Sequence, residues 1–318
     1  MSDEYGFMPD EATVSNLGQL RIDHSRITEQ RALELQDIAH VLADFVTSDG
    51  IRELDVAEIL SILGESLTLG ELIMPDDTPA ELKHTVNEEQ KLASYIDRAR
   101  LAELLIKELS LRGRTLHEGD FLDGGTEGER FTYVKNHLSD EAYDVFSEDF
   151  RDPRVKYSSS FKECAQALAD GEVDYILLPL EERGGVRLPS VAELIYRYDF
   201  KISAVTPVFG YDAGADVKYA LISKHFRLQR RHKGDDGYLE LRLPMNEECR
   251  LSEILSVSAY FGMTVYRVNT MTLDTEGEST GFFSFTLKDG GKGFTELFVY
   301  ALLFAPDLIP VGVYKNLE

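Results

Sequence analysis

Charged side chains come directly after an apolar segment in the middle of the sequence. The segment 174–185 reads DYILLPLEERGG, and its apolar part leads through a proline to Glu181, Glu182 and Arg183. A buried parallel strand ends in this way where it delivers polar side chains to a ligand cleft. Lys218, at the start of another apolar segment, would face the same cleft. Carboxylate, guanidinium and ammonium groups together could bind an anion or transfer a proton, although a solvated charge is the commoner role for each of them.

The region around these residues alternates between strand-like and helix-like segments. Strands are predicted for RFTYVK, RVKYSS, VDYILLPL, FKISAVTPVF and VKYALISKHF. Helices are predicted for a segment with Ser139 as its N-cap, for a segment beginning at Ser160, and for SVAELIYRYD. This alternation predicts a parallel or mixed sheet covered by helices.

The flanking regions have different patterns. Apolar residues recur at helical spacing in the N-terminal region, which is predicted to be helical up to a glycine-rich acidic segment, 117–129. A polar segment, 227–237, is predicted to be a linker. The C-terminal segments follow the order βαββαβ, which is typical of a ferredoxin-like unit. The sequence thus predicts a multidomain α+β and α/β protein with domains at 1–120, 130–226 and 237–318.

Composition narrows the classes of function. The 318 residues include 57 acids and 33 bases, which gives a formal net charge of -24. Such a surface repels nucleic acid and anionic membranes, so we expect neither as a partner. The 2 cysteines and 7 histidines show no metal-ligand spacing. We expect no metal and no cofactor, and a cytoplasmic protein, since neither a signal peptide nor a membrane span is evident.

The segment 160–181, SFKECAQALADGEVDYILLPLE, resembles the prephenate dehydratase family. In that family a helix rich in Ala and Leu ends in Gly and leads into a strand that contains a proline and ends in Glu. The C-terminal unit resembles the regulatory ACT domain that follows dehydratase domains. The resemblance implies an α/β lobe of the periplasmic-binding-protein type. It also implies an aromatic or carboxylate ligand and a role in phenylalanine metabolism.

The sequence departs from the family at the positions that carry its chemistry. Only one lobe fits, with its returning strand supplied by 217–223, whereas the family closes two lobes over the substrate. Glu182 and Arg183 replace an Asn and a Ser, and Lys218 lies in the segment that replaces the Thr-Arg-Phe signature. Without the threonine hydroxyl, the proton transfer credited to it is unavailable. We therefore expect a ligand site without catalysis, formed by Ser139, Ser160, Glu181, Glu182, Arg183 and Lys218.

The ACT-like segment also departs from its family. The expected ligand positions are occupied by Cys249, Leu251, Thr264, Asn269 and Thr270, and Cys249 replaces a glycine that would let backbone N–H groups approach a carboxylate. An ACT sheet can nevertheless pair side by side with a second copy. We expect this domain to form a homodimer rather than to sense phenylalanine.

Alternative functions remain open. An active dehydratase could carry a helical chorismate mutase in the N-terminal region, where Arg21, Arg26 and Arg31 recur. That spacing does not place the three arginines on one helical face, so structural helices are the simpler interpretation. A further alternative is a structural adaptor that only forms dimers. Our leading hypothesis is a non-catalytic relative that binds a small aromatic or carboxylate ligand, or a pathway enzyme.

Overall fold

The computed structural model describes residues 11–48, 55–67, 80–122, 124–125, 128–182, 186–209, 216–227, 237–245, 250–275, 278–290 and 294–315. Within these ranges, the side chains of residues 11–28, 66, 80–93, 216, 274–275 and 278 are not described. The chain forms two units, one of residues 1–53 and 100–115 and the other of residues 54–99 and 116–318.

The first unit contains two helical segments. They are α1 (Glu11–Val46) and the C-terminal part of α3 (Ala80–Leu111). Buried residues recur along α1 at Leu35, Ala39 and Val46, as the apolar periodicity predicts. Helices predicted for the N-terminal region are therefore present among its described residues.

Helix α2 (Val56–Ser66) belongs to the second unit and packs on α8 (Thr295–Phe304). Asp55 begins α2 as its N-cap, because its carboxylate accepts a hydrogen bond from the Ala57 N–H at 2.8 Å. The contact with α8 depends on Gly64, since a Cβ atom at this position would lie 2.6 Å from the backbone oxygen of Leu302.

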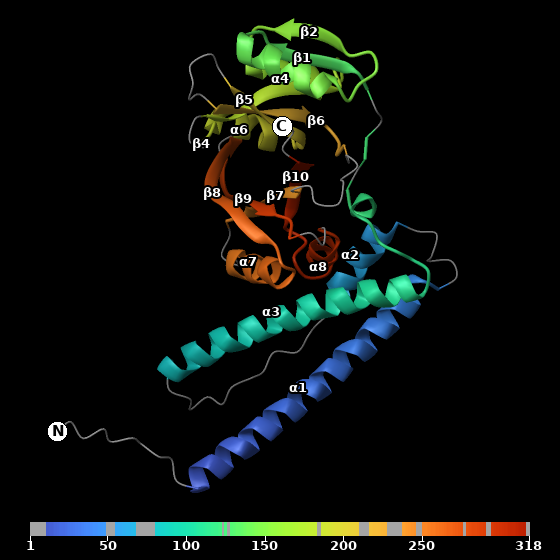
Figure 1. The fold of residues 1–318 in the computed structure, drawn as a ribbon, viewed down its shortest axis with the longest axis vertical. Helices are drawn as coiled ribbons and strands as arrows, with labels where there is room; N and C mark the ends of the chain where they lie inside the picture. Colours follow the sequence, from blue (N-terminus) through green and yellow to red (C-terminus); the bar gives the residue numbers. More distant parts are fainter. Residues whose placement is uncertain are drawn as a thin grey trace, which may run out of the picture. The chain divides into compact units, whose positions relative to one another are not determined.

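The second unit is built on one ten-stranded mixed sheet (Figure 1). Its strands are β1 (Arg130–Val134), β2 (Arg154–Ser158), β3 (Tyr175–Glu182), β4 (Val186–Arg187), β5 (Lys201–Phe209), β6 (Asp216–Ser223), β7 (Gly237–Pro244), β8 (Thr264–Thr275), β9 (Glu278–Lys288) and β10 (Ile309–Lys315). The order in space is β2-β1-β3-β6-β5-β10-β7-β9-β8, and β4 pairs with β3. The α/β mixed sheet expected from the sequence is therefore present.

Strand β6 is the returning strand predicted at 217–223, and it lies antiparallel between β3 and β5. Because both neighbours run antiparallel to β6, β3 and β5 point the same way. Their carboxyl ends meet at one edge of the sheet and their amino ends at the other. The side chains at the carboxyl ends of these strands differ from those at the amino ends, and each set of strand ends holds a different candidate site.

Helices cover both faces of strands β1, β3, β5 and β6. On one face, α4 (His137–Ser147) packs over a cluster that includes Phe131, Tyr133 and Phe146. On the other face, α5 (Phe161–Ala169) and α6 (Pro189–Arg197) cover Ile176 and Leu178. Alternate residues of β3 thus enter opposite clusters, as a strand buried on both faces requires.

The start of α4 corrects a prediction. The helix begins at His137 with Asn136 as its N-cap, not at Ser139. The Asn136 side chain accepts from the Ser139 N–H at 3.0 Å, and the Ser139 hydroxyl accepts from the Asn136 N–H at 2.9 Å. This reciprocal capping box uses the serine at the third helical position.

The C-terminal elements follow the predicted βαββαβ order, with α7 (Leu251–Tyr260) as their first helix. Helices α7 and α8 lie on one face of strands β7, β8 and β9 (Figure 1). Strand β10 pairs in parallel with β5, at Gly312 opposite Ile202, so one sheet runs through both 130–226 and 237–318. The domain limits drawn from the sequence stay predictions, and most of the expected linker lies outside the described residues.

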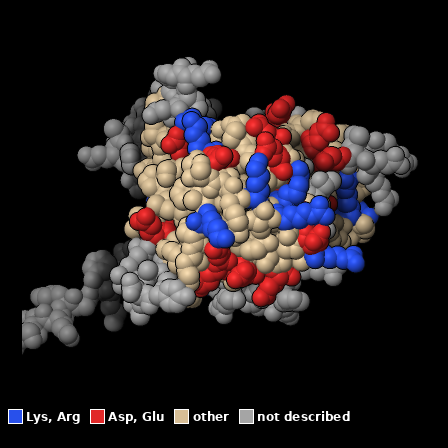
Figure 2. Space-filling model, turned by 90° about the horizontal axis from the view of Figure 1, so that it is seen from above, with Lys and Arg blue, Asp and Glu red and all other residues tan. Residues whose placement is uncertain are grey.

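Two surface properties bear on function. No helix in the described part of the chain is long and apolar enough to cross a membrane. Seen from above, Lys and Arg side chains gather into a group with Asp and Glu around it (Figure 2). On the face seen in this view, the basic side chains are therefore unevenly distributed.

Candidate functional site

Glu181 lies at the carboxyl end of β3 and is enclosed by cations. Its side chain accepts a hydrogen bond from Arg267 of β8. Lys218 of β6 lies 3.5 Å from Oε2, and Arg187 of β4 lies 3.9 Å from Oε1. Glu181 is only 4% exposed. The carboxylate that the sequence placed at a cleft is thus covered by side chains from three other strands.

Arg187 connects this carboxylate to a second buried cluster. Its guanidinium forms an ion pair with Glu240 of β7, which is fully buried. The Tyr196 hydroxyl of α6 lies 3.0 Å from Glu240 Oε1 and 2.6 Å from the Ser284 hydroxyl of β9. Burial without these contacts would cost several kcal/mol per ion. The cluster joins α6 and β4 to the C-terminal strands.

The electrostatics agree with a structural role for Glu181. Burial alone would raise the pKa of its carboxyl, but the hydrogen bond and charge of Arg267, with the charges of Lys218 and Arg187, hold the pKa below its ordinary value of 4.5. A carboxylate held ionised in this way is a poor proton donor and has little tendency to accept a proton.

The structure brings together only some residues of the predicted site. Glu181 and Lys218 are paired in register. Glu182 is exposed, and Arg183 lies outside the described residues. Ser139 and Ser160 are each engaged at a helix start, since the Ser160 hydroxyl accepts from the Glu163 N–H at 3.2 Å. Among the described members of this set, only Glu181 and Lys218 form an ion pair.

The predicted ACT ligand residues are spread over separate positions. Cys249 lies outside the described residues, and Leu251 begins α7. Thr264, Asn269 and Thr270 lie on β8, with both threonines exposed. Arg267, the β8 residue that contacts Glu181, was not predicted. Its strand could be recognised from the sequence, but its partner is a long-range contact that no local pattern indicates.

A cleft of about 600 Å³ lies at the opposite edge of the sheet. Its walls are formed by the first residues of β5 and β10 and by the residues that follow β6. Its volume is within the range of small-molecule sites. Aromatic rings and charged groups share its wall. The lining residues are Phe121, Ala169, Tyr198, Asp199, Phe200, Lys201, Lys224, His225, Phe226, Ile309 and Pro310.

The charged groups of this cleft are partly neutralised. Lys201 forms an ion pair with Asp199 at 3.0 Å, and the same carboxylate lies 3.1 Å from Arg242. The Lys224 ammonium donates to the Ala169 carbonyl at 2.6 Å, and no carboxylate among the described residues pairs with it. Tyr198 stacks on Phe200, with 5.3 Å between the ring centroids. Aromatic rings and a positive charge therefore lie side by side in the wall of the cleft.

The sequence contained a weak signal for this cleft. Lys201 begins one predicted strand, and Lys224 and His225 lie near the end of another. Ligands of α/β sheets usually bind at the carboxyl ends of parallel strands, so the general rule directs attention away from these residues. Because β6 runs antiparallel between β3 and β5, its carboxyl end lies beside the amino end of β5. This pairing follows from the order of the strands in the sheet, which the sequence alone does not give.

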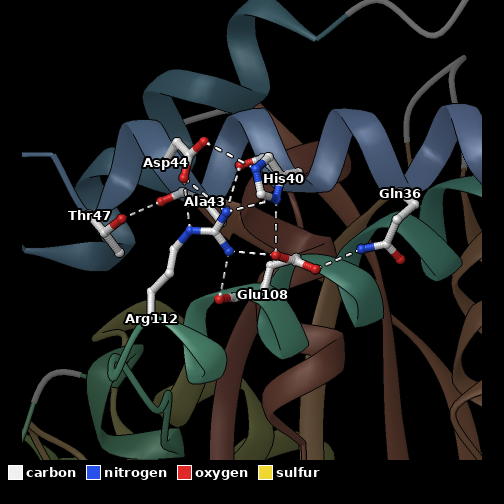
Figure 3. Close-up of polar contacts among 7 residues, drawn as sticks. All are labelled: Gln36, His40, Ala43, Asp44, Thr47, Glu108 and Arg112. Carbon is white, nitrogen blue, oxygen red and sulfur yellow. Dashed lines mark hydrogen bonds and ion pairs between the residues drawn. The ribbon is translucent and has the colours of Figure 1, made fainter.

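A third polar cluster joins α1 to α3 within the first unit (Figure 3). Arg112 donates to Asp44 at 2.9 Å and also binds Glu108, whose other oxygen accepts from Gln36 at 2.7 Å. The hydrogen bond from Arg112 lowers the pKa of Glu108, in spite of the burial that opposes this shift. His40 lies 2.9 Å from Arg112. These groups satisfy one another and connect the two helices.

The arginines considered for a mutase do not form a bundle site among the described residues. Arg31 pairs with Glu34 on the surface of α1 at 3.2 Å. The side chains of Arg21 and Arg26 lie outside the described part. Likewise, no group of three His, Cys, Asp or Glu side chains suited to a metal ion occurs in the described part of the chain.

Comparison with known proteins gives a distant resemblance only. No family model and no curated protein matches the chain. A prephenate dehydratase from Streptococcus mutans is similar over 60% of this chain and 100% of its own, at 15% identity and a TM-score of 0.48. A prephenate dehydratase from Arthrobacter aurescens, in complex with L-Phe, is similar over 58% of this chain and 89% of its own, at 14% identity and a TM-score of 0.40. A protein described as a novel type of quorum-quenching acylase is similar over 59% of this chain and 96% of its own, at 16% identity and a TM-score of 0.43. These values describe a related arrangement of elements, and no residue role is transferred from them.

Proposed function

We propose that the protein binds a small aromatic carboxylate without converting it, and that the ligand occupies the cleft lined by Tyr198, Lys201 and Lys224. The observation that carries this proposal is the cleft of about 600 Å³, in which aromatic rings lie beside ammonium groups. Rings stack on an aromatic ligand and a cation attracts its carboxylate. The sequence resemblance to prephenate dehydratases supports a ligand from phenylalanine metabolism.

The residues at the carboxyl ends of β3 and β5, where β6 begins, support the part of this proposal that excludes catalysis. Expulsion of water from a substrate needs a group that can donate or accept a proton near neutral pH. Glu181 is ionised, buried and covered by Arg267. Val217, Lys218 and Tyr219 occupy the positions of the Thr-Arg-Phe signature and supply no threonine hydroxyl.

A thermal-shift panel with phenylalanine, tyrosine, prephenate and chorismate tests the proposal. A ligand that binds only the folded protein raises its unfolding temperature. We expect at least one of the four to do so in the wild type and to lose most of this effect in Tyr198→Ala. Tyr157→Ala is the matched control, because it removes an exposed ring from the edge strand β2. No shift with any ligand would reject the proposal, and formation of phenylpyruvate from prephenate would favour the active dehydratase.

A dimer-forming adaptor is the second candidate, and strand β8 favours it. This strand ends the sheet and carries Val265, Tyr266 and Val268 at 40–47% exposure. The opposite edge strand, β2, carries the exposed ring of Tyr157 but also the exposed cations Arg154 and Lys156, which protect an edge from pairing. A homodimer through β8 predicts that Val268→Lys lowers the mass in solution to that of a monomer. A monomeric wild type would remove this candidate.

A further inference from the structure

A smaller cavity of about 180 Å³ adjoins the cleft. Lys224, His225 and Phe226 line both spaces, so a single ligand could extend from one to the other. The smaller cavity is also lined by Arg130, Asp174 and Arg227. Its wall is therefore rich in cationic groups, although the chain carries a formal net charge of -24.

The charges around this cavity can be counted from their contacts. Arg130 holds Asp174 through two hydrogen bonds, of 2.7 Å and 3.0 Å, and these two charges cancel. Lys224 and Arg227 have no carboxylate partner among the described residues. The lining therefore retains two positive charges, from Lys224 and Arg227, that nothing in the described part of the chain neutralises.

Arg227 is held in place before any ligand binds. Its guanidinium carbon lies 4.0 Å from the centroid of the Phe150 ring, and Nη2 donates to the Asp149 carbonyl at 3.3 Å. Nη1 is buried and has no hydrogen-bond partner in the described structure. An arginine fixed on a ring loses little side-chain entropy when it binds an anion.

We infer that the 180 Å³ cavity is a subsite for a phosphate monoester group, with Arg227 and Lys224 as its cationic contacts. A phosphate group carries a charge of about −1.5 to −2 at pH 7, which matches two uncompensated cations, whereas one carboxylate would leave a cation unpaired. The cavity volume of about 180 Å³ is several times the ~30 Å³ that one water molecule occupies in the liquid. The phosphate group can therefore enter together with part of its hydration shell. This inference rests on the proposed function and extends it, because the aromatic carboxylate bound in the cleft would also carry a phosphate monoester group that enters the smaller cavity.

Two probes separate the subsite from the cleft. Inorganic phosphate reports on the subsite alone, and phenyl phosphate adds a ring that reaches the cleft. In calorimetric titrations at constant ionic strength, both bind the wild type, and phenyl phosphate binds more tightly. Arg227→Ala weakens both by about tenfold or more, as expected for loss of a charge-assisted contact. Tyr198→Ala weakens only phenyl phosphate.

Matched variants make the result decisive. Arg154→Ala removes the same charge from a side chain that is 77% exposed on β2, and phosphate binding stays at the wild-type level. Lys224→Ala changes an exposed residue and gives a second, folding-neutral loss of phosphate affinity. Equal binding of phosphate to wild type and Arg227→Ala, or no binding at all, overturns the subsite. A retained shift with the aromatic carboxylates would then leave the proposed function standing, and malonate binding as tightly as phosphate would also overturn the phosphate assignment.

Discussion

At the scale of single residues, the role of Glu181 is decided by Arg267. The two side chains lie 86 positions apart in the chain and form a direct hydrogen bond. A carboxylate at an open strand end could take part in proton transfer, but one enclosed by cations acts as a structural contact. The same residue type at the same strand position therefore has a different role once β8 covers it.

Removal of Arg267 should destabilise the protein measurably. Arg267→Ala leaves Glu181 buried with only the longer contacts to Lys218 and Arg187. We expect the free energy of unfolding in urea to fall by about 1–3 kcal/mol, the usual cost of a buried polar group that loses its partner.

Lys218→Ala is the control for this prediction. The Lys218 side chain is 24% exposed and its ammonium lies 3.5 Å from Glu181, so its loss should cost no more than about 1 kcal/mol. An Arg267→Ala variant as stable as the wild type would show that the ion pair does not hold β3 to β8.

The ionisation of Glu181 predicts a dependence of stability on pH. Because its pKa is lowered in the folded protein, the carboxylate contributes stability above about pH 4.5 and loses it as the pH falls through the folded pKa. Glu181→Gln should be less stable than the wild type at pH 7, and the difference should narrow below pH 4.5. Urea unfolding at a series of pH values checks this, and a constant difference down to pH 3 would contradict it.

At the scale of elements, the contact between α2 and α8 depends on a missing side chain. Alanine is intrinsically about 1 kcal/mol better than glycine inside a helix, so Gly64→Ala would stabilise an isolated α2. In the protein, the new Cβ would lie 2.6–2.9 Å from backbone atoms of Leu302 and Leu303, which cannot rotate away. We expect a net loss of about 1–3 kcal/mol from overpacking.

Ser61→Ala in the same helix is the matched substitution and should change stability by less than about 0.5 kcal/mol. Thermal unfolding of both variants measures the difference. A Gly64→Ala protein that melts above the wild type would show that helix propensity outweighs the α2–α8 contact.

The contact between α1 and α3 makes a second prediction at this scale. Arg112 bridges Asp44 and Glu108 (Figure 3), so Arg112→Ala should reduce hydrogen-exchange protection severalfold in the C-terminal half of α1. Lys107→Ala, on the exposed side of α3, should leave this protection unchanged. Equal protection in both variants would mean that apolar packing alone holds the helices.

At the scale of the whole molecule, local patterns predicted the elements but not their long-range neighbours. Most helices and strands, the returning strand at 217–223 and the βαββαβ order follow from periodicity and turn residues, whereas strand β4 was not predicted. The pairing of β10 with β5, and the contacts of Arg187 and Arg267, join distant segments and leave no local signal.

The same limit explains the position of the candidate cleft. A sequence pattern assigns a residue to a strand end, but the sheet order decides which strand ends meet. Lys224 follows an antiparallel strand, so it lies at the amino end of β5 rather than beside Glu181. The two ends of one sheet therefore carry an enclosed ion cluster and an open cleft.

The most direct measurement compares ligand binding in a variant at the carboxyl ends of the strands and in a variant at their amino ends. Calorimetric titration with the ligand that gives the largest thermal shift should yield similar affinity in the wild type and in Glu181→Gln, and at least about tenfold weaker binding in Tyr198→Ala. Phenylpyruvate should not form from prephenate with any of the three proteins. Binding that is lost in Glu181→Gln but kept in Tyr198→Ala, or turnover that Glu181→Gln abolishes, would place the functional site at the carboxyl edge and contradict the account.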